Sequence, residues 1–272
     1  MLDLLVLFRE SIAGTLVIAA VGSLLGVYML LRRVVFVGAA LAQLSSAGLA
    51  LAAFLASAGV ALGVLTNRYL LALLCTVVGV AFLARQDHRR GIPADARLGM
   101  AFVLAGGAAI LLVARSATAD LHDLFFGGDV LLMTRAELAR LALVGGAVLA
   151  LHLAAMKEFV FVSFDPEMAA TLGYRVRRWS LLLYLSAAAL ITVAIASAGV
   201  LLTFGYLVLP PICGLLLGKR LGGVFAWSVA AGVAGTLLGF LASIRLDLPT
   251  GATVIVSLGA LALVARLAKP FR

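Results

Sequence analysis

Three side chains that commonly bind metal ions lie within four residues of one another near the middle of the chain. Asp120, His122 and Asp123 stand in the run ADLHD, and their carboxylate and imidazole groups could bind a divalent cation. A solvated loop or a contact with another protein explains this cluster equally well. Asp129 follows the pair Gly127-Gly128 and is a candidate either for a helix cap or for a group that faces a pathway through the protein.

A fourth candidate ligand, His152, lies inside a long apolar run. An ionisable side chain at such a depth is a functional candidate in its own right. The simpler interpretation is a neutral imidazole that hydrogen-bonds to a neighbouring helix, and we favour it.

Uncharged polar groups interrupt two other apolar runs. Gln43, Ser45 and Ser46 fall within about one helical turn, so they should face the interior of a helix bundle rather than lipid. Tyr206 and the pair Pro210-Pro211 mark a second run. Two prolines remove two backbone donors, which predicts a broken helix there, and broken helices often line transport pathways.

These polar residues belong to a chain that is too apolar to be solvated by water alone. Of its 272 residues 64% are hydrophobic and only 12% are charged, and the mean hydropathy is +1.20. Soluble domains are about 45–50% apolar and about 25% charged. The composition therefore predicts a polytopic membrane protein and excludes soluble enzymes, disordered tails and secreted disulfide scaffolds.

The apolar runs predict an all-α bundle of about nine membrane spans in a single domain covering residues 1–272. A span needs about 20 apolar residues. The predicted spans are 6–31, 34–58, 69–84, 97–115, 137–157, 179–198, 200–217, 221–243 and 251–267. Eight spans are the alternative, because only Gly199 separates two of these runs.

The basic residues predict the orientation of the chain. With nine spans and the N-terminus outside, 15 of the 21 lysines and arginines fall on the inner side. The positive-inside rule then places the N-terminus outside and the C-terminus in the cytoplasm. The net charge of +9 is explained by these loops and does not require a nucleic-acid partner.

Two loops are long enough to contain structure. The outer loop, 116–136, has a middle that is too apolar for a free loop and too short to span, which favours a re-entrant segment. In the inner loop, 158–178, Asp165 is a candidate N-cap, Pro166 the first helical residue, Glu167 a first-turn acid and Gly173 the stop. A short helix on the cytoplasmic face is therefore expected.

Small residues recur at helical spacing. The pairs Gly22/Gly26 and Gly235/Gly239 favour close helix packing. The run ASAGV occurs at 56–60 and again at 196–200, each near the outer end of a span, but five small residues do not establish an internal duplication.

No enzymatic motif is found in the sequence. GLLLGKR (214–220) is one residue too short between its glycines for a phosphate-binding loop and has Arg220 where Ser or Thr should hold magnesium. No G-x-S-x-G nucleophile motif occurs. We therefore expect no catalytic residues, no cofactor and, if ATP drives the protein, a separate chain that binds it.

Four stretches, in order, resemble the integral membrane permeases of ATP-binding-cassette importers for zinc, manganese and iron. They are RRVVFVGAALAQLSSAGLALA (32–52), LHDLFFGGDVL (121–131), FVSFDPEMAATLGYRV (161–176), and SAGVLLTFGYLVLPP (197–211) followed by LDLPTGATVIV (246–256). The resemblance covers about residues 10–267.

The resemblance implies a transport subunit in a bacterial plasma membrane that imports a divalent metal cation or a metal chelate by alternating access. Its implied partners are an ATPase subunit that meets Asp165, Pro166, Glu167 and Gly173, an extracytoplasmic solute-binding protein, a second copy of the permease, and membrane lipid.

The sequence departs from the family where its metal ligands are expected. The family carries Asp and then His one helical turn later, and the matching residues here are Ala39 and Gln43. Either the ligands have moved, to His152 or Asp129 for example, or the cargo is not a bare cation. A membrane scaffold that has lost transport is one alternative. A secondary carrier is another, although no Asp or Glu lies centrally in any of the nine predicted spans.

Overall fold

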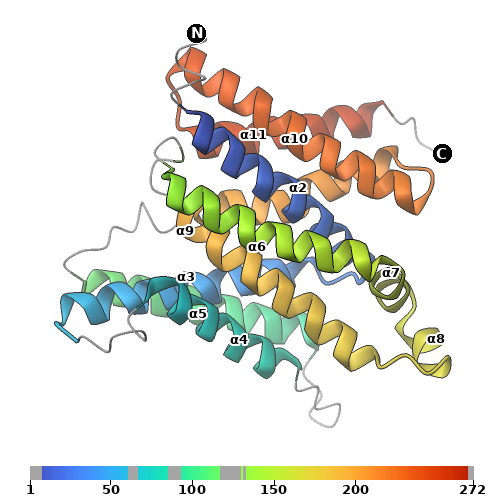
Figure 1. The fold of residues 1–272 in the computed structure, drawn as a ribbon, viewed down its shortest axis with the longest axis horizontal. Coiled ribbons are helices and arrows are strands. Elements are labelled where there is room, and N and C mark those ends of the chain that lie inside the picture. Colours follow the sequence, from blue (N-terminus) through green and yellow to red (C-terminus); the bar gives the residue numbers. More distant parts are fainter. Residues whose placement is uncertain (1–7, 61–66, 85–92, 117–129, 131–132, 269–272) are drawn as a thin grey trace.

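The computed structural model describes residues 8–60, 67–84, 93–116, 130 and 133–268, and over these ranges it is helical without a strand. Figure 1 shows the helices running roughly side by side as a bundle. The helices are α2 (Arg9–Leu31), α3 (Val35–Ser57), α4 (Arg68–Ala84), α5 (Ala94–Ala114), α6 (Arg135–Ala154), α7 (Met156–Phe164), α8 (Pro166–Thr171), α9 (Val176–Leu217), α10 (Leu221–Leu246) and α11 (Thr250–Leu267).

The all-helical membrane architecture expected from the composition is confirmed at this level. Seven of the described helices are long and apolar enough to cross a bilayer, and α4 is a shorter apolar helix. Large apolar side chains cover the outside of the bundle, among them Leu111, Leu143 and Val256, each at least 70% exposed. Such side chains are stable in lipid and costly in water.

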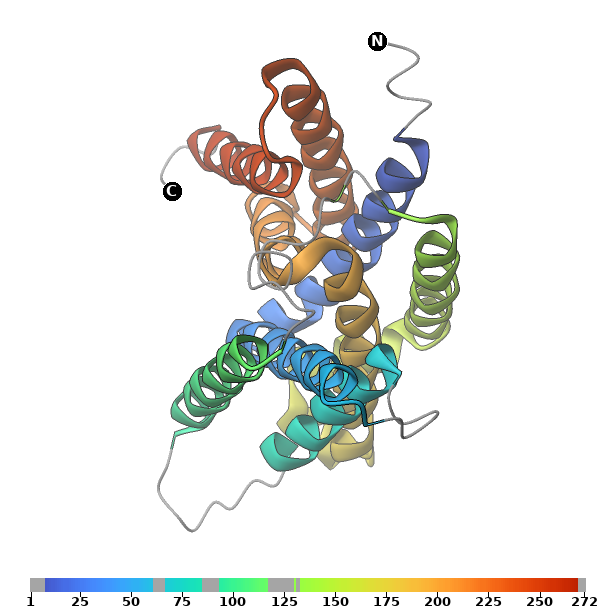
Figure 2. The ribbon, with the colours of Figure 1, turned by 90° about the vertical axis from the view of Figure 1, so that its left-hand side faces the viewer.

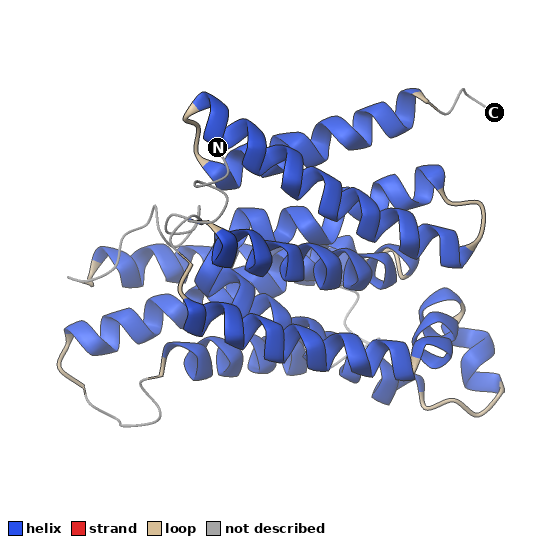
Figure 3. Ribbon diagram, turned by 45° about the horizontal axis from the view of Figure 1, so that its top comes forward, coloured by secondary structure: helices blue, strands red, loops and turns tan. Residues whose placement is uncertain are grey.

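Helix α9 is too long to be one span. Its 42 residues would extend about 63 Å at about 1.5 Å per residue, roughly twice the thickness of the hydrocarbon core. Gly199 divides it, with φ 77° and ψ 169°, a conformation open to glycine and strained for other residues. Both ends of α9 lie at the end of the bundle that carries α7 and α8 (Figures 1 and 3), so the chain reverses at Gly199.

The predicted break at the two prolines is wrong. The helix continues through Pro210 and Pro211 to Leu217, and Gly199 is its only non-helical residue. The two prolines withdraw the donors that would bond the carbonyls of Tyr206 and Leu207. The Leu207 carbonyl instead lies against Gly26 of α2, so closely that a methyl group there would collide with it. Packing against a glycine surface thus supports the helix where its own hydrogen bonds are missing.

Helix α2 runs through the middle of the bundle (Figure 2), in contact with α3, α6, α7, α9 and α10. Its small residues allow these contacts. A methyl group at Gly22 would meet Tyr206, and a methyl group at Gly232 of α10 would collide with the Ser23 hydroxyl of α2. Between α10 and α11, Gly235 and Gly239 lie directly against Leu258 and Val254. The glycine pairs therefore serve helix packing, as their spacing indicates.

Polar contacts fix the end of the bundle where α6 begins. The Thr134 hydroxyl accepts a hydrogen bond from the Glu137 backbone N–H, and the Thr134 backbone N–H donates to the Glu137 carboxylate in return, a capping box. Arg135 pairs with Glu10 at 3.2 Å, which ties α6 to α2, and Arg68 pairs with Glu137 at 3.1 Å, which ties α4 to α6. The expected re-entrant segment in 116–136 lies almost wholly outside the described residues.

Candidate functional site

The polar turn of α3 is buried, as expected for residues that avoid lipid. Gln43 is 7% exposed and Ser45 and Ser46 are fully enclosed. Ser45 Oγ bonds Thr192 Oγ1 of α9 at 3.3 Å. Gln43 faces α5, where a methyl group on Gly106 would lie 3.4 Å from its Oε1 atom. This turn of α3 therefore faces α5 and the first half of α9.

Two atoms of this turn lack a hydrogen-bond partner in the part of the chain that the structure describes: Gln43 Oε1 and Ser46 Oγ. A buried polar atom without a partner costs about 1–3 kcal/mol. Such groups are rare in native proteins, and a functional role or a bound water or ion is the usual explanation. His152 Nδ1 and several other buried atoms of the described residues share this feature, but only in this turn do two such atoms lie three residues apart, which keeps Gln43 and Ser46 as candidate pathway residues.

Ala39 lies one turn before Gln43 and is also buried, at 5% exposure, so the two share the inner face of α3. Neither side chain is a strong metal ligand. Among the described residues no three His, Cys, Asp or Glu side chains come together. Asp120, His122, Asp123 and Asp129 lie outside these residues, so their proposed roles stay predictions.

His152 is fully buried at a junction of four helices. Its Nε2 atom is 3.1 Å from Ser186 Oγ of α9. Its ring lies 5.1 Å from the Tyr28 ring of α2 and 4.3 Å from the Phe159 ring of α7, the latter edge to face. Its Nδ1 atom has no partner among the described residues. These surroundings are those of a packed aromatic side chain.

Tyr206 lies apart from both Gln43 and His152. Its hydroxyl bonds Thr236 of α10 at 2.6 Å, and with Pro210 and Pro211 it packs in the second half of α9. Helix α6 packs on α2, α7 and α9, whereas α3 packs on α2, α4, α5 and α9. The structure therefore does not gather the candidate pathway residues that it describes, which leave out Asp129, into one cluster.

The short helix expected in the inner loop is present as α8. Asp165 accepts a hydrogen bond from the Met168 backbone N–H at 2.9 Å, and Pro166 is the first helical residue. Gly173 ends the segment with φ 84°. Phe164 at the end of α7, Met168 within α8 and Leu172 at the C-cap of α8 are 68%, 53% and 62% exposed. A capped helix with exposed apolar side chains in and beside it is typical of a protein-docking element.

Arg32 connects this segment to the spanning helices, a role that the sequence did not reveal. From the end of α2, its Nε donates to Ser163 of α7 at 3.0 Å and its Nη1 donates to Ser180 of α9 at 2.8 Å. Its guanidinium also lies 5.7 Å from the centre of the Tyr184 ring. In the sequence Arg32 looks like an ordinary basic anchor, since its partners are more than 130 residues away.

Comparison with known proteins agrees with this architecture. A probable iron transport system membrane protein of Haemophilus influenzae is 25% identical over 252 residues, which are 91% of this chain and 88% of that protein. The manganese import system permease protein ScaB of Streptococcus gordonii is 24% identical over 249 residues, 92% of this chain and 86% of ScaB.

The structure of PsaBC from Streptococcus pneumoniae in complex with Fab shares the fold, with a TM-score of 0.83 and 19% identity over 96% of this chain and 91% of that one. The family model described as the ABC 3 transport family matches residues 5–269. That match spans nearly the whole chain and confirms the resemblance noted in the sequence, so the chain belongs to the ABC 3 transport family.

Proposed function

We propose that this chain is the membrane permease subunit of an ATP-driven importer whose cargo is a divalent metal cation or a metal chelate. The observation that carries the proposal is the family match over residues 5–269. The manganese and iron transport names of its relatives support the choice of cargo.

Helix α8 is the proposed contact with a separate ATPase subunit. Asp165 and Pro166 hold the helix, Gly173 ends it, Glu167 offers an exposed charge, and Met168 with the adjoining Phe164 offers the apolar surface. Arg32 would transmit movement of α7 and α8 to α2 and α9, because it donates hydrogen bonds to α7 and α9 from the end of α2. Two copies of the permease and an extracytoplasmic binding protein complete the proposed assembly.

The polar turn of α3 is the proposed part of the pathway in this chain. Cargo moving past α3 would give Gln43 Oε1 and Ser46 Oγ the polar partner that they lack among the described residues. Ala39 and Gln43 supply no anionic ligand, which favours weak, transient contact over tight binding. Asp129 remains a candidate at the outer entrance, and we propose that His152 braces helices and does not bind metal.

The proposed topology has nine spans in the plasma membrane with the N-terminus outside and the C-terminus in the cytoplasm. Counting α4 and each half of α9 as spans supports the number nine. The distribution of basic residues supports the orientation.

The test is metal uptake in a strain from which this chain has been deleted. We expect reduced accumulation of manganese or iron, restored by the wild-type chain supplied in trans. Comparing free manganese with a chelated metal separates the two kinds of cargo. Unchanged content of manganese, iron and zinc under metal limitation would contradict the proposal and favour a scaffold role.

A further inference from the structure

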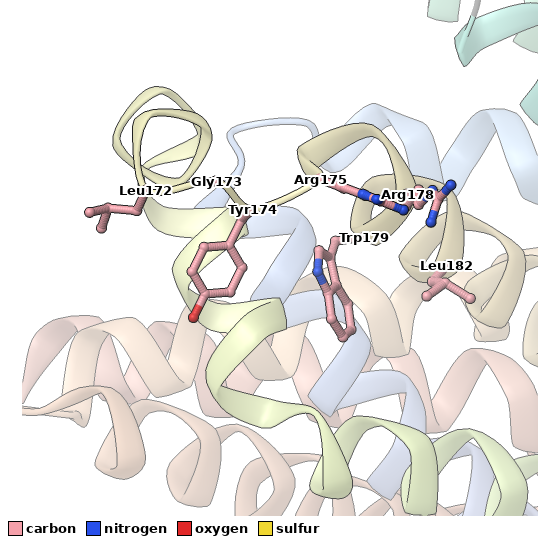
Figure 4. A pocket seen from close by; sticks show the side chains of 7 residues that line it. All are labelled: Leu172, Gly173, Tyr174, Arg175, Arg178, Trp179 and Leu182. Atoms are coloured by element: carbon pink, nitrogen blue, oxygen red, sulfur yellow. The ribbon is translucent and has the colours of Figure 1, made fainter.

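A pocket of about 470 Å³ lies where the chain enters α9. It is lined by Leu172, Gly173, Tyr174, Arg175, Arg178, Trp179 and Leu182. Figure 4 shows the rings of Tyr174 and Trp179 extending in the same direction from this segment, and the side chain of Arg175 reaching toward Arg178. The pocket thus combines two guanidinium groups with an aromatic and aliphatic wall.

The aromatic wall is held in place by α7. The Trp179 ring lies 5.2 Å from the Phe159 ring at an interplanar angle of 81°, and the Tyr174 ring lies 5.4 Å from the Phe161 ring at 74°. Edge-to-face pairs of this kind restrict ring rotation. The wall is therefore formed before any ligand arrives, which lowers the cost of binding.

The two arginines lack an anionic partner in the described ranges of the chain. Arg175 and Arg178 are exposed and form no ion pair with the carboxylates placed there, and Glu167 of α8, the acid nearest in sequence, pairs with neither. Arg175 is the N-cap of α9 and Arg178 lies in its first turn, and the side chain of Arg175 reaches toward Arg178 (Figure 4). Guanidinium groups so placed favour a phosphate group, which accepts hydrogen bonds from both.

The pocket lies at the boundary between the polar and the apolar part of the protein. Arg175 immediately precedes α9, which is apolar enough to span the membrane. Leu182 and Leu185 follow Arg178 by one and two turns and are 41% and 38% exposed. Tyr and Trp are the residues that prefer this level of a bilayer. A ligand here would have an anionic head and an apolar tail.

We propose that this pocket binds the headgroup of an anionic phospholipid. The phosphate diester lies between Arg175 and Arg178, the glycerol region lies against Tyr174 and Trp179, and an acyl chain follows Leu182 and Leu185 down α9. Because Leu172 at the end of α8 also lines the pocket, the bound lipid steadies the segment between α8 and α9. This proposal concerns lipid and is independent of the nature of the cargo.

The experiment uses the full-length chain in lipid nanodiscs and the fluorescence of Trp179. The chain has two tryptophans, so a Trp227→Phe background leaves Trp179 as the reporter. Lipids with brominated acyl chains quench a tryptophan that they contact. We expect brominated phosphatidylglycerol to reach half-maximal quenching at a mole fraction several-fold lower than brominated phosphatidylcholine.

The matched variants separate the pocket from general surface charge. Arg178→Gln should reduce the preference for phosphatidylglycerol about fivefold, the contribution typical of one basic residue near an anionic surface. Arg177→Gln removes the same charge at the neighbouring residue, which does not line the pocket, and should change the preference much less. Millimolar inorganic phosphate should not restore Trp179 fluorescence, since it has no acyl chain.

Four results would overturn the proposal. The first is equal quenching by the two lipids in the wild-type background. The second is an equal loss of preference in Arg177→Gln and Arg178→Gln, which would show general charge attraction. The third is relief of quenching by inorganic phosphate, which would show a free-anion site. The fourth is loss of the ATPase from Arg178→Gln with lipid preference unchanged, which would show that these arginines face the ATPase.

Discussion

Arg32 hydrogen-bonds two side chains that lie more than 130 residues away in the sequence. It is half-buried, it bonds two serines on different helices, and Ser163 would be left buried without its donor if the guanidinium were removed. Arg32→Gln should therefore lower the free energy of unfolding by about 1–3 kcal/mol. It should lower transport further than stability alone explains, because α7 would lose its link to α2.

The control for Arg32 is its neighbour. Arg33→Gln removes the same charge from an exposed residue and should leave the unfolding temperature in detergent nearly unchanged. Arg32→Lys should recover only part of the loss, since an ammonium group cannot span both serines as a planar fork does. Equal effects of Arg32→Gln and Arg33→Gln on unfolding would contradict the bridging role.

Replacing Gln43 should affect stability and transport differently: stability should rise or stay unchanged, and transport should fall. Its Oε1 atom has no hydrogen-bond partner in the described part of the chain, so Gln43→Leu should raise the unfolding temperature or leave it unchanged. If cargo passes this turn, metal uptake should nevertheless fall several-fold. Uptake assays and thermal unfolding on the same variant check both parts.

The comparison for Gln43 is His152→Phe, which preserves the aromatic packing and removes the hydrogen bond to Ser186. We expect it to lower stability and to leave uptake per folded molecule unchanged. Lost uptake at full stability in His152→Phe, together with normal uptake in Gln43→Leu, would move the pathway to His152.

At the scale of residues, the sequence predicted burial better than partnership. Gln43, Ser45 and Ser46 were expected to face inward because lipid penalises polar groups, and they do. Arg32 could not be identified, because its serine partners lie on helices whose neighbours are decided by tertiary packing. Periodicity within one helix contains no information about which helix lies opposite.

Among the elements, α9 depends on one glycine. Gly199 has φ 77° and ψ 169°, a conformation nearly confined to glycine that costs about 1–3 kcal/mol for a residue with a side chain, and the Thr203 hydroxyl donates to its carbonyl at 2.7 Å. Gly199→Ala should lower the free energy of unfolding by at least about this amount. Gly146→Ala on α6, where a methyl group meets only open space, should be neutral or stabilising by up to about 1 kcal/mol. A Gly199→Ala protein as stable as Gly146→Ala would contradict the account of the reversal.

Helix α8 provides the second prediction at this scale. Glu167→Arg reverses an exposed charge in its first turn and should abolish copurification of the ATPase or its stimulated ATP hydrolysis. Arg220→Glu changes charge by the same amount in the loop before α10, at the same end of the bundle, and should retain both. If Glu167→Arg keeps a fully active ATPase bound, the docking assignment fails.

The elements also show where reading of a sequence succeeds and fails. The cap at Asp165 and the stop at Gly173 involve neighbours in the chain, so local signals were sufficient. The break predicted at Pro210 and Pro211 was wrong because the helix continues without two of its hydrogen bonds where Leu207 packs on Gly26 of α2. The repeated run ASAGV carries a shared local signal after all: Gly59 and Gly199 both have positive φ, of 71° and 77°.

At the scale of the whole molecule, topology is the open prediction. Reporter fusions after Arg272 and after Arg115 should report the cytoplasm and the exterior, because nine spans and the basic residues place them on opposite sides. Both reporters on one side would contradict the nine-span arrangement, and exchanged sides would contradict the orientation.

The position of α9 at the centre of the packing bears on how the protein is made. Helix α9 packs against α2, α3, α4, α6, α7, α8, α10 and α11. It begins at Val176, so well over half of the chain is synthesised before it. Until α9 is inserted, the earlier helices lack their contacts with it. Ser45 then has no Thr192 partner, and the Gly26 surface of α2 is not covered by the Leu207 carbonyl. We therefore expect the earlier helices to pack together only once α9 is inserted, and chains truncated before residue 176 should be cleared by membrane proteases.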